Sequence, residues 1–149
     1  MHCEWVDGPF AISTDPDRLD VEVIHTYLSQ RAYWAQGRPK EVVQRSIAHS
    51  LCFGVYEERS QIGFARVVTD YATFAYLCDV FILESHRRRG LSKWLLRCVR
   101  THPALAGIRR FQLITNDAHG LYRQLGFTAL ANPERHMELV EYDRARSEP

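Results

Sequence analysis

The sequence has no long apolar segment and no strong excess of charge, and both absences narrow what the protein can be. None of its apolar runs is long enough to span a bilayer, and no basic stretch followed by an apolar core occurs near its first residues. With 19 basic and 18 acidic residues, the net charge is +1. Because no overall field then draws the chain to nucleic acid or to a membrane surface, we expect neither among its partners.

The common fingerprints for phosphate and metal binding are also missing. Neither GxxxxGK followed by Ser or Thr nor GxGxxG occurs, which argues against a P-loop kinase. The four cysteines form no CxxC pair and no zinc-binding spacing with histidines, so we expect no metal site. We interpret Cys52, Cys78 and Cys98 as small buried hydrophobic residues, and such free thiols favour a reducing, cytoplasmic location.

The length and the apolar periodicity predict a single domain spanning residues 1–149. The predicted elements are a strand over 10–14, helices over 19–30 and 40–50, three antiparallel strands over 51–56, 61–69 and 73–83, a helix over 90–101, a strand over 109–115, a helix over 117–125 and closing strands over 127–130 and 136–142. This order predicts a mixed α/β (α+β) fold, with a mostly antiparallel sheet of six to seven strands flanked by about four helices.

Three consecutive arginines stand directly before the helix predicted over 90–101. Because a helix N-terminus already carries partial positive charge, added cations are unfavourable there unless an anion offsets them. The turn follows the strand over 73–83, a place where ligands bind in α/β units, and Gly90 lets a ligand approach the backbone. We therefore predict a pyrophosphate site, with a solvated basic turn as the alternative. The predicted phosphate-binding residues are Arg87, Arg88, Arg89, Gly90, Leu91, Ser92 and Lys93.

Two segments carry a resemblance to a known family. The stretch VFILESHRRRGLSKWLL resembles the acyl-CoA-binding signature of the GNAT superfamily, the Gcn5-related N-acetyltransferases, which reads Arg/Gln-x-x-Gly-x-Gly/Ala. Arg87 and Gly90 match its first two positions, and Ser92 replaces the usual Gly or Ala at the third. The stretch TNDAHGLYRQLGF resembles a later segment of the family, in which an asparagine precedes Ala-x-x-Leu/Phe-Tyr-x-x-Leu-Gly-Phe. The order of elements agrees with that fold over roughly residues 10–140.

The resemblance implies transfer of an acyl group, usually acetyl, from acetyl-CoA to a primary amine of a small molecule or amino acid. It implies that Tyr122 is the acid that protonates the leaving thiolate, and that Asn116 contacts the pantetheine arm or an ordered water. Backbone groups of Val80, Phe81 and Ile82 would pair with the pantetheine amides, and the N–H of Phe81 or Ile82 would face the carbonyl oxygen. The alternatives are a core tyrosine for Tyr122 and a turn residue for Asn116.

Asp79 is an isolated carboxylate in the apolar run YLCDVF, and burying it is costly unless it is paired or solvated. It is a candidate base acting through water, an anchor for the amine, or a structural partner of an arginine. In the family, the loop between the early helices contributes to the acceptor pocket. Here that loop supplies Tyr33, Trp34 and Arg38, which suit a small acceptor with a carboxylate, unless the two rings plug the core.

Two other functions compete with catalysis. One is a CoA-binding regulatory module of the same fold without catalysis, and Tyr122 argues against it. The other is a nucleic-acid-binding domain that uses the arginine turn, which the near-neutral charge argues against. A homodimer is possible, because the C-terminal strands are able to pair between two copies.

Overall fold

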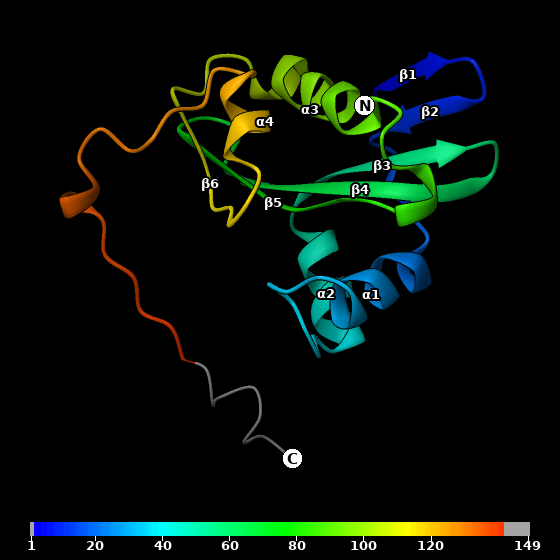
Figure 1. Ribbon diagram of the computed structural model, residues 1–149, viewed down its shortest axis with the longest axis horizontal. Helices are drawn as coiled ribbons and strands as arrows, with labels where there is room; N and C mark the ends of the chain where they lie inside the picture. Colours follow the sequence, from blue (N-terminus) through cyan, green and yellow to red (C-terminus); the bar gives the residue numbers. More distant parts are fainter. Residues whose placement is uncertain (1, 142–149) are drawn as a thin grey trace.

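A six-stranded sheet with strand order β1-β2-β3-β4-β5-β6 forms the centre of the computed structural model, which describes residues 2–141 (Figure 1). Neighbouring strands are antiparallel except for β5 and β6, which are parallel. The strands are β1 (Glu4–Asp7), β2 (Phe10–Ser13), β3 (Leu51–Glu57), β4 (Ser60–Thr69), β5 (Phe74–Ile82) and β6 (Arg110–Leu113). The predicted mixed fold is therefore confirmed.

Helices cover both faces of the sheet (Figure 1). The helices are α1 (Val21–Gln30), α2 (Lys40–Ala48), α3 (Leu91–Thr101) and α4 (His119–Arg123). On one face, the apolar side of α3 packs its Leu95 and Val99 against strand residues such as Phe53. On the other face, Ile24 and Leu28 of α1 pack against Phe64. No helix among residues 2–141 has both the length and the apolar character needed to cross a membrane.

The hairpin of β1 and β2 replaces the single first strand predicted over 10–14. Its strands pair from Glu4 opposite Ser13 to Asp7 opposite Phe10, so Gly8 and Pro9 form the turn. Gly8 adopts φ +60°, a conformation that favours glycine in tight hairpin turns. Glycine at the first position of a two-residue turn is the local signal for such a hairpin.

The crossover from β5 through α3 to β6 leaves half of β5 without a neighbour on one side. The parallel pairing joins Phe74–Leu77 to Arg110–Leu113, whereas β5 continues to Ile82. Because β6 stops early, residues 78–82 of β5 have no strand partner on this side within residues 2–141. We call these residues the unpaired edge of β5.

The prediction of closing strands over 127–130 and 136–142 was wrong for residues 127–130 and 136–141, which the structure describes. Residues 128–141, which we call the C-terminal arm, contain a short 3-10 turn at Pro133–Arg135 and no strand. The arm leads away from the sheet (Figure 1). A strand needs a partner for its backbone groups, and in this conformation the arm has not paired with the sheet. Tyr142 lies outside the described residues.

Candidate functional site

The candidate site begins at the unpaired edge of β5, after its last pairing with β6. The N–H of Leu83 donates to the carbonyl oxygen of Ile62 at 2.8 Å, so Leu83 faces β4. Backbone groups alternate in direction along a strand. The N–H of Phe81 therefore also faces β4, and that of Ile82 points to the open side. Of the two amides predicted to face a carbonyl oxygen, Ile82 is the better placed.

Asp79 sits at an irregularity in β5. Phe64 pairs with Phe81, whereas Arg66 pairs with Cys78, so β5 carries one extra residue between these pairs. Asp79 adopts φ +53°, which is uncommon for a residue with a side chain. Such a bulge redirects a side chain at the edge of a functional site. Here it turns the carboxylate toward the loop between α1 and α2.

The Asp79 carboxylate is held by three donors. Its Oδ1 accepts from Trp34 Nε1 at 2.9 Å, and its Oδ2 accepts from Arg38 at 2.9 Å and from Arg66 Nε at 2.8 Å. The residue is only 3% exposed, so these ion pairs lie in a largely dry environment. A structural pairing with arginine, one of the three roles considered for Asp79, is therefore present. The pairing ties the loop after α1 to the bulge of β5.

The aromatic residues of that loop do not plug the core. Tyr33 is 49% exposed and Trp34 is 40% exposed, and their rings meet edge to face at a centroid distance of 5.0 Å. The Tyr33 hydroxyl accepts from the backbone N–H of Asn116 at 3.1 Å. The loop after α1 therefore contacts the segment that follows β6.

Tyr122 lies on α4, beside the same segment. Burial raises the pKa of its phenol to about 12, and the nearby Tyr33 adds to this rise. The ring packs against Phe127 at a centroid distance of 5.9 Å. The structure thus brings Tyr33, Asn116 and Tyr122 together, and it keeps the phenol protonated at neutral pH.

The basic residues of the arginine turn differ in their contacts: one makes hydrogen bonds within the protein, and the others are exposed. Arg87 donates from Nε to the carbonyl oxygen of Ile82 at 3.0 Å and to the Tyr27 hydroxyl at 2.7 Å, so it holds the turn against α1. Arg88, Arg89 and Lys93 are exposed. Tyr27 was not among the predicted site residues, because its helical spacing identifies it only as a core residue.

Gly90 is the cap of α3 and leaves room above the helix start. It adopts φ +76°, and a Cβ added there would meet no atom within 4 Å. The first amides of a helix have no partner within the helix. The amides of Leu91, Ser92 and Lys93 therefore border an open space, and the exposed cations of the turn flank it.

The described residues contain no group of three His, Cys, Asp or Glu side chains arranged to hold a metal ion. Cys52 and Cys78 lie close to Arg66 and Asp79. Burial raises the pKa of Cys52 to about 12 and that of Cys78 to about 11, so both stay protonated at neutral pH.

Comparisons with known proteins point to one family. Residues 48–129 match the family model described as an acetyltransferase (GNAT) domain. The protein named putative acetyltransferase FG08082, from Gibberella zeae, is 34% identical over an alignment of 140 positions, and the match covers 79% of this chain and 78% of that protein.

Solved structures agree in fold. A GNAT-family protein from Xanthomonas campestris pv. campestris has 52% identity and a TM-score of 0.87, with 89% of this chain and 93% of that chain covered. A protein from Deinococcus radiodurans R1 shares the fold at 18% identity and a TM-score of 0.63, over 100% of this chain and 93% of that chain.

Proposed function

Because the chain belongs to the GNAT family of acetyltransferases, we propose that it transfers an acetyl group from acetyl-CoA to a primary amine of a small molecule or amino acid. The observation that carries the proposal is the unpaired half of β5, which runs from the Asp79 bulge to the open start of α3. An extended pantetheine arm can add to such an edge through backbone hydrogen bonds. Its pyrophosphate would then meet the first amides of α3.

The turn supplies the charge that a pyrophosphate needs. Backbone amides at a helix N-terminus and the helix dipole both favour an anion. Arg88, Arg89 and Lys93 are exposed around this point, so they are free to approach the outer oxygens. Arg87 is occupied by Ile82 and Tyr27, and we assign it the task of shaping the turn.

The transfer itself follows from the chemistry of a thioester. The neutral amine attacks the carbonyl carbon, and negative charge on the oxygen is met by the N–H of Ile82. The C–S bond then breaks, its electron pair goes to sulfur, and the sulfur takes the proton of the Tyr122 phenol. Because the pKa of that phenol is raised to about 12, we expect this proton transfer to be concerted with C–S cleavage. The proton lost by the attacking amine later restores the phenol.

The acceptor would lie between the loop after α1 and the bulge. Arg38 and Arg66 face the single carboxylate of Asp79, so two positive charges oppose one negative charge. The remaining positive charge favours an acceptor that carries a carboxylate. The exposed rings of Tyr33 and Trp34 offer an apolar wall beside it. An amino acid or a similar small carboxylated amine fits both features.

The experiment measures free thiol released from acetyl-CoA while a panel of amino acids and other small amines is added. We expect release that depends on the amine and is faster for amines with a carboxylate than for the matched amines without one. The competing function, a CoA-binding regulatory module, predicts that acetyl-CoA binds in calorimetry while no amine accelerates thiol release. That result would overturn the proposal.

A further inference from the structure

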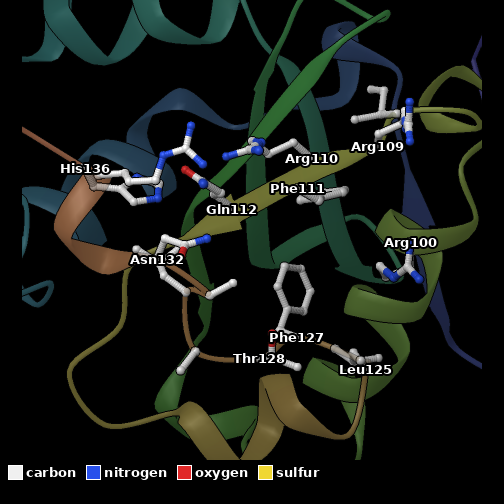
Figure 2. A pocket seen from close by; sticks show the side chains of 16 residues that line it. Arg100, Arg109, Arg110, Phe111, Gln112, Leu125, Phe127, Thr128, Asn132 and His136 are labelled. Atoms are coloured by element: carbon white, nitrogen blue, oxygen red, sulfur yellow. The ribbon is translucent and has the colours of Figure 1, made fainter.

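Two hollows outside the proposed transfer site differ in the chemistry of the side chains that line them. A cavity of about 730 Å³ lies between β6 and the C-terminal arm, where Arg110, Gln112 and His136 line it (Figure 2). None of the described residues that line this cavity is acidic. A hollow of about 620 Å³, which we call the α1 groove, is lined by side chains of α1 and of the turn after β5. It contains a nucleophile, the hydroxyl of Ser85.

This hydroxyl is hydrogen-bonded to the imidazole of the next residue. Ser85 Oγ lies 2.7 Å from His86 Nδ1, and His86 Nε2 lies 3.1 Å from Glu57 Oε1. Because an ionised carboxylate only accepts hydrogen bonds, Nε2 carries the ring proton, and Nδ1 of the neutral ring accepts from Ser85. The three side chains therefore follow the order of nucleophile, base and carboxylate that activates a serine.

The sheet fixes the base and its carboxylate, while the serine faces the solvent. Glu57 ends β3, and His86 lies 29 residues later in the short 3-10 turn Glu84–His86 after β5. The side chain of His86 is 17% exposed, whereas Ser85 belongs to the exposed residues. The backbone N–H of Ser85 has no hydrogen-bond partner among residues 2–141. It is therefore available to the oxygen of an acyl group attached to the same residue.

The α1 groove suits an uncharged, apolar group. Val23, Tyr27 and Leu83 supply apolar surface to its lining. The charged side chains of the lining are paired within the protein, in the ion pairs Glu22–Lys40 and Arg31–Glu84. A charged ligand would have to compete with these existing pairs, whereas a short apolar chain gains from leaving water. The groove therefore favours a neutral ligand beside the Ser85 hydroxyl.

We propose that Ser85, His86 and Glu57 form an active site that hydrolyses small uncharged carboxylic esters with a short apolar acyl chain. Ser85 Oγ attacks the carbonyl carbon while His86 Nδ1 takes the hydroxyl proton. The bond to the leaving oxygen then breaks, its electron pair stays on that oxygen, and His86 returns the proton to it. Water attacks the acyl-serine in the same way, so the products are the free acid, the alcohol and the restored serine.

The first test measures p-nitrophenol released from p-nitrophenyl butyrate by the full chain without any coenzyme. We expect release well above the buffer rate, its loss in Ser85→Ala, and a fall of about 100-fold or more in His86→Gln. The matched control is Ser46→Ala, because the Ser46 hydroxyl donates at 2.7 Å to the carbonyl oxygen of Val43 and not to a base. This control should keep the full rate. Release no faster than in buffer, or equal release by Ser85→Ala, overturns the proposal.

The second test uses an alkyl fluorophosphonate, which bonds to an activated serine oxygen and releases fluoride. Peptide masses should place the label on Ser85 of the unmodified protein, and His86→Gln should remain unlabelled while its melting curve shows that it is folded. If the three side chains only hold the turn in place, Glu57→Gln lowers the melting temperature and Ser85 of the unmodified protein takes no label. That result overturns the proposal. Both tests are independent of acetyl transfer, because neither contains acetyl-CoA.

Discussion

At the scale of single residues, Asp79 joins the loop after α1 to the sheet. Its side chain is 1% exposed, and those of Arg38 and Arg66 are 22% and 14% exposed. Removing one member of a buried ion pair leaves an uncompensated charge, which is far more costly than losing a pair on the surface. Because three donors hold its two oxygens, we propose that Asp79 positions Trp34 and Arg38.

Asp79→Asn should lower the free energy of unfolding by roughly 3–5 kcal/mol, because a neutral amide cannot balance two buried guanidinium groups. It should also raise the KM for the acceptor while the Kd for acetyl-CoA is unchanged. Urea unfolding and steady-state kinetics check both effects. The matched control is Glu84→Gln, which removes an exposed ion pair with Arg31 and should cost at most about 1 kcal/mol. Equal costs for the two variants would contradict this role of Asp79.

At the scale of elements, the start of α3 differs from an ordinary helix start because we assign it a contact with the coenzyme. Gly90 and Gly107 both adopt positive φ, at +76° and +87°, and a Cβ added at either would meet no atom within 4 Å. Only Gly90 borders the amides that we assign to the pyrophosphate. The two glycines therefore share a backbone requirement and differ in their proposed contact with a ligand.

Gly90→Ala and Gly107→Ala should lower stability by similar amounts, about 1–2 kcal/mol, because each forces a residue with a Cβ into the left-handed region. Only Gly90→Ala should also weaken acetyl-CoA binding. Thermal unfolding and calorimetric titration measure the two effects. If both variants bind acetyl-CoA as tightly as the unmodified protein, the coenzyme does not approach the backbone at Gly90.

At the scale of the whole molecule, sequence reasoning predicts the elements whose pattern is local. The periodicity of α3 and the Gly90 cap were sufficient to predict the crossover and the turn. The hydrogen bond between Tyr33 and Asn116, 83 residues apart, has no such local signal. The triple contact of Asp79 also depends on a register change in β5 that no pattern in the sequence indicates. Residues 136–141 have strand periodicity, but a strand also needs a neighbour for its backbone groups, and the periodicity does not identify one.

The pH dependence of stability is another whole-molecule property. His102 directly follows α3, packs against Trp5 and Phe53, and accepts from the N–H of Ala104 at 3.1 Å. Burial lowers the pKa of this imidazole from its ordinary value of 6.5. The unfolded chain therefore binds the proton first as the pH falls below about 6.5, so His102 makes the folded state less stable in acid.

His102→Asn keeps an acceptor for Ala104 and removes the titrating group. We expect the melting temperature of the unmodified protein to fall more between pH 7.5 and 5 than that of the variant. The corresponding difference in the free energy of unfolding should amount to at most about 1.4 kcal/mol per pH unit. Calorimetric melting at several pH values measures it. Parallel pH profiles for the two proteins would show that His102 is not responsible.

The most direct test of the proposed chemistry compares Tyr122→Phe with the unmodified protein in amine-dependent thiol release from acetyl-CoA. Tyr71→Phe serves as the control, because Tyr71 is 52% exposed outside the site. The account predicts that Tyr122→Phe lowers kcat by about 100-fold or more while its Kd for acetyl-CoA is unchanged. A kcat equal to that of the unmodified protein would contradict it.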